Sequence, residues 1–221
     1  MNDAPPPDDT SPAPPPPGDG GPYCEEIQHA QVSAVVPERV ARGVFSTGAV
    51  VVQGAHEFIL DFLLRMAQPQ QVAARVVLPP GVVAQFIAAL SDNLNNYQSK
   101  YGPPQLPPAA LAQAQAATSP NSAQELYEQL KLQDDVLSGQ YANAVMIGHT
   151  PCEFCFDFIT TFFPRSAVSS RVFMAAPGVP RLLDSLKHSF EKYQQKLMQH
   201  RWPPAPPAPP SAPAPPAEDP G

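Results

Sequence analysis

Cys152 and Cys155 have the spacing of a thioredoxin-type redox pair or of half a zinc knuckle, which makes them the residues with the sharpest chemical signal in the chain. They fall in a segment with strand character, where side chains three residues apart point to opposite faces. We therefore expect the two thiols to diverge rather than share a metal or close a disulfide. A metal or redox role for this pair is the alternative.

Four charged residues also occur in a pattern that could do chemistry. They alternate in phase with their neighbours on segments expected to be adjacent antiparallel strands. The expected structural ion pairs are Asp61 with Arg75 and Asp157 with Arg171. The alternative is that these side chains clamp the carboxylate of a ligand.

No other residues form a recognisable catalytic pattern. The five histidines lack the spacing of a metal site, and the chain has no phosphate-binding loop, nucleophile elbow or nucleotide fingerprint. We therefore predict that the protein is not an enzyme and has no cofactor, metal or catalytic residues.

Composition narrows the range of partners. The chain has 221 residues and a net charge of −7, and its lysines and arginines form no basic stripe, so no nucleic-acid binding is expected. It has no basic start followed by an apolar run, and no stretch approaches the ~18 apolar residues of a membrane helix. We expect a cytoplasmic protein without a membrane anchor.

Proline marks the boundaries between segments, because most of the 32 prolines gather in three stretches. The expected domains are a disordered acidic N-terminal tail at 1–40, a first repeat at 41–101, a linker at 102–121, a second repeat with a preceding short helix at 122–200, and a disordered C-terminal tail at 201–221. PxxP matches such as 204–207 favour polyproline II, so the tails are expected either to bind prolyl-recognition domains or simply to solubilise the chain.

An internal repeat organises the chain between the tails. Shifting the sequence by 96 residues aligns His56–Phe62 with Cys152–Phe158, and the match continues without a gap for about 58 residues. The first copy has His56 and Ile59 where the second has the two cysteines, which argues that the fold does not require sulfur there.

Each copy predicts three strands followed by a helix. An apolar run, Phe45–Val52 or Tyr141–Ile147, leads through a short turn into an alternating strand, as in a β-hairpin. A third strand, Val72–Leu78 or Val168–Met174, precedes a proline-containing helix start. A short helix at 122–132 precedes the second copy, whereas Glu26–Val40 is ambiguous between strand and coil. The predicted fold class is α+β, with two tandem βββα repeats, each an antiparallel sheet plus one long amphipathic helix, forming a pseudo-twofold pair.

The core is expected to lie between the phenylalanine face of each sheet and the apolar stripe of the helix in the same repeat. The expected core residues are Phe58, Leu60, Phe62, Leu90 and Tyr97 in the first copy, and Phe154, Phe156, Phe158, Leu186 and Tyr193 in the second.

These residues resemble a known family. Tyr141-Ala-Asn143, Glu153-Phe154, Asp157-Phe158, Arg171-Val172 and the helix ending in Tyr193 are similar to the recurring pattern of the bacterial domain of unknown function 3467. The first copy departs from it, with Phe45-Ser-Thr47 at the opening. The resemblance implies a covalently fused version of a unit that elsewhere associates, and it implies no activity.

We expect the function to be non-enzymatic protein binding or assembly, through self-association or a protein partner. The first strand is apolar on both faces, more than one helix can cover, so a sheet edge or a groove between the repeats is expected to take a partner segment. One alternative is a holdase-like chaperone that binds apolar segments, and another is a small-ligand binder or enzyme that uses the Asp/Arg face of the sheet.

Overall fold

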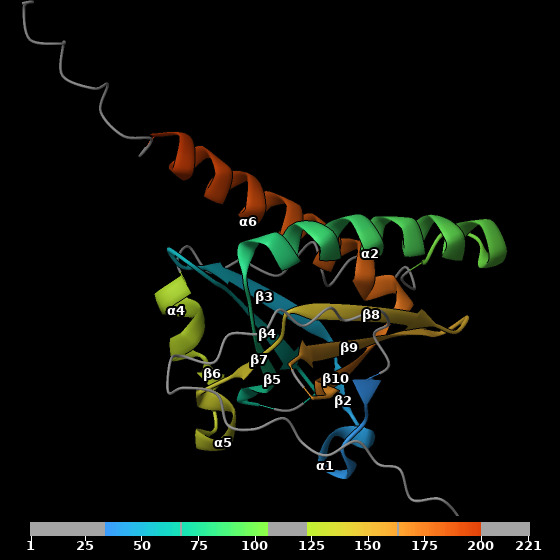
Figure 1. Cartoon of the computed structure of the whole chain (residues 1–221), viewed down its shortest axis with the longest axis horizontal. Coiled ribbons are helices and arrows are strands. Elements are labelled where there is room, and N and C mark those ends of the chain that lie inside the picture. Colours follow the sequence, from blue (N-terminus) through green and yellow to red (C-terminus); the bar gives the residue numbers. More distant parts are fainter. Residues whose placement is uncertain (1–33, 67, 106–122, 163, 200–221) are drawn as a thin grey trace, which may run out of the picture. The chain divides into compact units, whose positions relative to one another are not determined.

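Two β-sheets and two long helices form the described part of the chain (Figure 1). The computed structural model describes residues 34–66, 68–105, 123–162 and 164–199. Most of the expected N-terminal tail, most of the linker and the C-terminal tail at 201–221 lie outside the described residues.

The elements of the two repeats follow one another in the same order. Those of the first repeat are β1 (Ala34–Val35), α1 (Glu38–Ala41), β2 (Val44–Ser46), β3 (Gly48–Gln53), β4 (Phe58–Leu64), β5 (Gln70–Leu78) and α2 (Pro80–Tyr101). Those of the second are α4 (Ala123–Glu128), β6 (Leu130–Lys131), α5 (Asp134–Leu137), β7 (Gln140–Tyr141), β8 (Ala144–His149), β9 (Glu153–Thr161), β10 (Ser166–Ala175), η1 (Ala176–Gly178) and α6 (Val179–Gln199). The shift of 96 residues superposes the strands, the short helices α1 and α5, and the long helices α2 and α6.

Each sheet contains three antiparallel strands of one repeat and two short strands of the other. In the first-repeat sheet, β3, β4 and β5 are neighbours, and β6 and β7 both pair in parallel with β5. In the second-repeat sheet, β8, β9 and β10 are neighbours, and β1 and β2 both pair in parallel with β10. The repeats therefore exchange their leading arms, residues 34–46 and 130–141, which adds to the simple three-strand pattern.

The arms correct two expectations about local structure. The expected first strand, Phe45–Val52, is split at Thr47 into β2 and β3, which belong to different sheets. At the split, the Thr47 amide donates to the Leu63 carbonyl at 2.8 Å, so the chain starts its new pairing at once. The folded part also begins earlier than residue 41, because β1 and α1 lie within the segment assigned to the N-terminal tail.

The expectation that each long helix covers its own sheet is wrong. Helix α6 lies against β3 of the first repeat, and α2 lies against β8 of the second. The ring contacts agree: Phe58 packs on Tyr193 at 5.3 Å between centroids, and Tyr97 packs on Phe154 at 5.3 Å. Both helices also contact each other and cross above the sheets in Figure 1.

A single hydrophobic core results from this exchange. It includes all the expected core positions, and nine of the ten are buried, whereas Tyr193 is only partly buried. The rings of Phe62 and Phe158, from different sheets, lie 5.6 Å apart. Because apolar burial is worth ~1.5–3 kcal/mol per large side chain, the joint core should make the two repeats stabilise each other.

A smaller apolar cluster covers the opposite face of the first-repeat sheet. Leu63, Val72 and Leu130 are its buried members, and Leu126 and Tyr127 of α4 pack against them. The expected short helix at 122–132 is observed as α4 followed by the short strand β6.

Among the described residues, no helix combines the length and apolar character needed to span a membrane.

Candidate functional site

Asp61 and Arg75 face each other directly across β4 and β5. Arg75 Nε donates to Asp61 Oδ1 and Arg75 Nη2 donates to Asp61 Oδ2, both at 2.8 Å, while the Asp61 side chain is fully buried. The Tyr127 hydroxyl donates to the same Oδ2 atom. Burial, followed by the hydrogen bond to Asp61, raises the pKa of Tyr127 to about 12.

Asp157 and Arg171 form the equivalent pair across β9 and β10. Arg171 Nε and Nη2 donate to the two carboxylate oxygens at 2.6 and 2.7 Å. The hydrogen bond to Asp157 raises the pKa of Arg171 above its ordinary value, and the hydrogen bond to Asp61 does the same for Arg75. Each carboxylate is therefore occupied by its own arginine in a bidentate pair.

The same arginines reach into the arm of the other repeat. Arg75 Nη1 donates to the Leu137 carbonyl at 3.1 Å, and Arg171 Nη1 donates to the Ala41 carbonyl at 3.4 Å. Leu137 is the last residue of α5 and Ala41 is the last residue of α1. Backbone carbonyls at the end of a helix have no hydrogen-bond partner within the helix. Each ion pair thus fastens one repeat's arm to the other repeat's sheet.

Two glycines allow the arms to approach so closely. Gly43 and Gly139 have φ of 63° and 72°, in the left-handed region that favours glycine. A Cβ at Gly43 would lie 2.6 Å from Cε2 of Phe173, and one at Gly139 would lie 3.0 Å from Cγ of Arg75. Gly43 and Gly139 are 96 residues apart, at equivalent positions of the two repeats. A glycine kept in both copies was therefore a signal in the sequence for a turn with positive φ.

The thiols do not form a shared site. Cys152 is exposed in the turn before β9, whereas Cys155 is partly buried on the strand, and both are free. Cys155 Sγ lies 3.8 Å from Asp157 Oδ1, and burial, followed by the Asp157 charge, raises the thiol pKa to about 11. A thiol with a raised pKa is a poor nucleophile near neutral pH.

Three of the five histidines, His56, His149 and His188, lie in the described part of the chain. The His149 ring lies among aromatic rings, and its centroid is 5.2 Å from that of Phe154 and 5.6 Å from that of Tyr97. Among the residues that the structure describes, no three His, Cys, Asp or Glu side chains converge as metal ligands would. His29, His200 and Cys24 lie outside the described residues.

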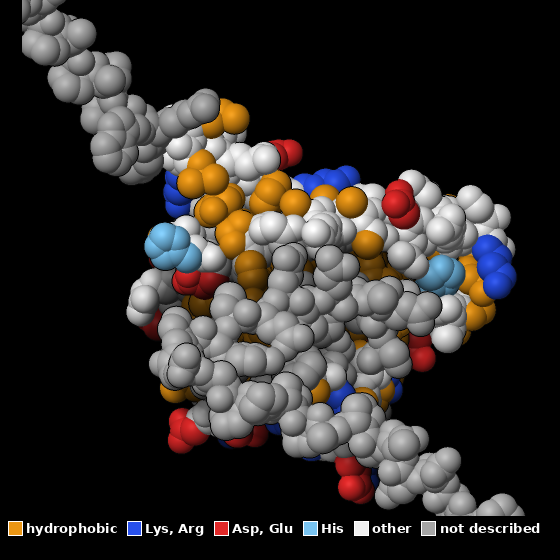
Figure 2. Space-filling view, in the orientation of Figure 1, with side chains coloured by type: hydrophobic (Ala, Val, Ile, Leu, Met, Phe, Trp, Pro, Cys, Tyr) orange, Lys and Arg blue, Asp and Glu red, His pale blue; other side chains and the backbone are white. Residues whose placement is uncertain are grey.

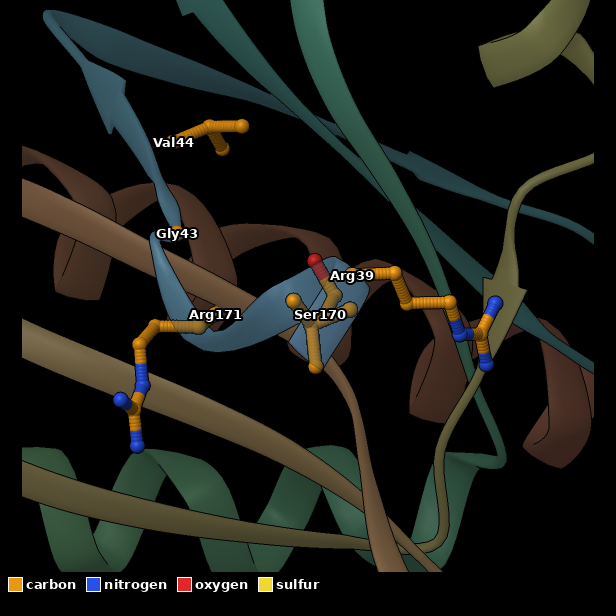
Figure 3. Close-up of a pocket in the computed structure, with 6 residues that line it drawn as sticks. Arg39, Gly43, Val44, Ser170 and Arg171 are labelled. Atoms are coloured by element: carbon orange, nitrogen blue, oxygen red, sulfur yellow. The ribbon is translucent and has the colours of Figure 1, made fainter. Parts of the chain in front are cut away.

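A shallow hollow of about 80 Å³ borders the second ion pair. It is lined by Arg39, Val40, Gly43, Val44, Ser170 and Arg171. In Figure 3 the guanidinium groups of Arg39 and Arg171 point away from each other, so their charges do not converge on the hollow. The hollow therefore lacks the paired cations that would hold an anionic ligand.

Sequence comparison of the two copies missed one shared interaction. Asn143 Oδ1 accepts from the Thr161 amide at 2.7 Å, and Thr47 Oγ1 accepts from the Arg65 amide at 3.0 Å. Thr47 and Asn143 are equivalent positions that looked like a departure from the pattern. Both side chains offer an oxygen acceptor, and that shared chemistry was the available signal.

The sequence reasoning also missed a set of exposed apolar positions. Three pairs of equivalent positions carry large apolar side chains that are more than a third exposed in both repeats: Phe45 and Tyr141, Met66 and Phe162, and Tyr101 and Leu197. The rings of Tyr141 and Phe162 stack in parallel, 5.9 Å apart. We define these six residues as the recurring apolar surface.

The fold and these contacts define a tandemly duplicated α+β protein whose halves exchange arms and long helices. A family model described as "Protein of unknown function (DUF3467)" matches the chain twice, at residues 9–106 and 110–200. The chain belongs to this family, which confirms the resemblance and the tandem duplication seen in the sequence. Neither the comparison with curated proteins nor that with solved structures gave a match.

Proposed function

We propose that this protein is a non-enzymatic protein-binding or assembly module of the cytoplasm. The observation that carries the proposal is the recurring apolar surface, at which both repeats keep large apolar side chains exposed at the same positions. Single exposed apolar residues are common on protein surfaces, whereas contiguous apolar patches mark interaction sites. Tyr141 and Phe162 are contiguous, because their rings stack 5.9 Å apart. The free thiols of Cys152 and Cys155 fit a reducing compartment.

The proposed architecture is a pseudo-twofold pair of βββα units. Arms, long helices and ion pairs correspond one to one between the halves. A partner that contacts Phe45 on one half would find Tyr141 in the corresponding place on the other, so the module would offer a partner two related surfaces.

Strand addition at β3 or β8 is the less favoured route to a partner. Each of these strands pairs with a single described neighbour, but a long helix lies against it. Covering a sheet edge with a helix is one way in which proteins prevent edge-to-edge pairing. We therefore propose contact through apolar side chains rather than through the strand edges.

The ion pairs do not favour a small-ligand function. Asp61 accepts hydrogen bonds from Arg75 and Tyr127 in a fully buried position, and Arg171 occupies both carboxylate oxygens of Asp157. A ligand carboxylate would have to displace one of these bidentate pairs, which is costly for buried partners.

The test compares the native chain with a variant that lacks part of the recurring apolar surface. Phe45→Ser, Met66→Ser, Tyr141→Ser and Phe162→Ser are combined, and partner proteins are quantified by affinity isolation together with light scattering. We expect partner capture or self-association to fall at least tenfold, with the far-UV circular dichroism unchanged.

The matched control is Val35→Lys, which removes an equally exposed apolar side chain whose counterpart in the second repeat is already Lys131. This variant should retain every partner. If the native chain, the quadruple variant and the control capture the same proteins and all remain monomeric, the proposal fails.

A further inference from the structure

The apolar stripe of α6 continues past the sheet that it covers. Leu186 is fully buried and Phe190 and Tyr193 are partly buried, whereas Leu197 is 53% exposed and Met198 is 73% exposed. Hydrophobic side chains gather along this part of α6 in Figure 2. The last two turns of α6 therefore present apolar side chains that no described element covers completely.

The equivalent part of α2 is buried as far as Tyr97, although Tyr101, the counterpart of Leu197, is 36% exposed. Leu94 and Tyr97 are the counterparts of Phe190 and Tyr193, and each is only 5% exposed. The Tyr97 hydroxyl donates to the Pro151 carbonyl at 2.7 Å, and the His149 ring packs on Tyr97. The sequence difference lies in the hairpin turn, which carries His149-Thr-Pro in one repeat and Gln53-Gly-Ala in the other.

The open end of α6 is aromatic as well as apolar. Tyr193 contacts Phe58 at 5.3 Å and Phe190 at 6.2 Å between ring centroids, and Phe190 contacts Phe58 at 6.1 Å. Surfaces lined by aromatic rings are the usual recognition sites for proline-rich segments in the polyproline II conformation. Such segments lose little conformational entropy on binding because they are already extended.

The chain itself supplies such a segment shortly after α6 in the sequence. Residues 203–216 contain nine prolines in fourteen residues and begin four residues after Gln199, the last residue of α6. The helix rises ~14 Å between Phe190 and Gln199 at 1.5 Å per residue. At 3.1 Å per residue, about five residues of polyproline II span that distance, so the segment is long enough to fold back along the helix.

We propose that the proline-rich segment 203–216 docks in cis on the aromatic end of α6, formed by Phe190, Tyr193 and Leu197. Docking of this kind requires the chain to reverse its direction between Gln199 and residue 203. A second copy of α6 is the less suitable occupant, because two exposed turns offer less than the ~1,200 Å² that a stable interface buries. This contact would also cover Leu197, a member of the recurring apolar surface, but it does not depend on the proposed function.

The experiment uses the full chain. A nitroxide is attached at Ala208→Cys in a background with Cys24→Ser, Cys152→Ser and Cys155→Ile, the last copying the Ile59 of the first repeat. Paramagnetic broadening of backbone amide signals is then measured. We expect the signals of Tyr193 and Leu197 to be lost, and those of Tyr97 and Tyr101 to be unaffected.

Three controls keep the outcome decisive. Replacing the nine prolines of 203–216 by serine should restore the Tyr193 and Leu197 signals. Leu197→Gln with Met198→Gln should restore the Tyr193 signal, whereas Tyr101→Gln on α2 should leave the broadening intact. Broadening that survives the serine replacement would reflect mere proximity and would overturn the proposal. Broadening that appears only between a labelled and an unlabelled copy would assign the surface to a second molecule and would equally overturn docking in cis.

Discussion

At the level of single residues, Asp61 and Asp157 occupy equivalent places but differ in their surroundings. Asp61 is fully buried and accepts from Arg75 and Tyr127, whereas Asp157 keeps some contact with solvent and accepts from Arg171 and the Cys155 thiol. Because breaking a buried pair leaves an uncompensated charge, the more enclosed pair should be the more sensitive one.

Asp61→Ala should lower the free energy of unfolding by ~3–5 kcal/mol, the range for a buried ion pair that loses one partner. Asp157→Ala should cost about half as much, and both values can be measured by urea unfolding. Asp61→Leu combined with Arg75→Met should recover most of the loss, since it removes both charges. Equal losses at Asp61 and Asp157 would contradict this account.

Tyr127 predicts a specific loss of stability at high pH. Its pKa is raised from the usual 10.0 to about 12, so the folded chain binds this proton more tightly than the unfolded chain. The resulting stabilisation is complete below pH 10 and is lost as pH rises towards 12. Unfolding in urea at several pH values should therefore show a steeper decline for the native chain than for Tyr127→Phe over this range. Identical slopes would be the contrary result.

At the level of elements, the turn after each short helix decides whether an arm can reach the neighbouring sheet. Gly43 and Gly139 combine a positive φ with close contacts to β10 and β5, so the arms depend on two positions without a side chain. Gly81, at the start of α2, has nothing within 4 Å of the place a Cβ would take. These glycines form a matched set for mutation.

Gly43→Ala should lower the free energy of unfolding by more than ~1 kcal/mol, because it adds backbone strain and a clash with Phe173 and Arg171. Gly81→Ala should instead raise it by ~0.5–1 kcal/mol through higher helix propensity. Thermal unfolding of the two variants gives the comparison. A neutral Gly43→Ala would show that the arm is not held as described.

Several elements were predictable from the sequence, and the reasons are physical. The repeat follows from the self-similarity of the sequence at a shift of 96 residues. The β3–β4 hairpin and the pairing of Asp61 with Arg75 follow from local alternation of side chains. The partner of each helix does not follow, since Phe58 and Phe154 present the same kind of face and α2 and α6 carry the same kind of stripe. Packing each helix on the sheet of its own repeat and packing it on the sheet of the other repeat would therefore bury similar apolar faces. The two arrangements differ in the path that the chain takes from sheet to helix. The hydrogen bond from Tyr127 to Asp61 could not be predicted, because it depends on the placement of α4.

At the level of the whole molecule, the exchange of arms and helices means that neither half has a complete core. The helix over β3 comes from the second repeat, and the helix over β8 comes from the first. A small unit that loses its covering helix cannot bury enough apolar area to offset its conformational entropy.

Residues 1–115 and 116–221 expressed separately should therefore be unfolded or homodimeric, and an equimolar mixture should form a 1:1 complex. The full chain should unfold in one cooperative transition, as seen by both circular dichroism and tyrosine fluorescence. Light scattering of each half gives the check. A folded, monomeric half would be incompatible with the exchanged helices.

The two arms also differ in sign, although their backbones correspond. The arm at 34–46 carries Arg39 and Arg42 against Glu38, whereas the arm at 130–141 carries Asp134 and Asp135 against Lys131. A homodimer of identical chains would have to repeat the same electrostatic pattern at both ends. Fusion into one polypeptide removes that requirement, so the two arms can carry net charges of opposite sign on corresponding backbones.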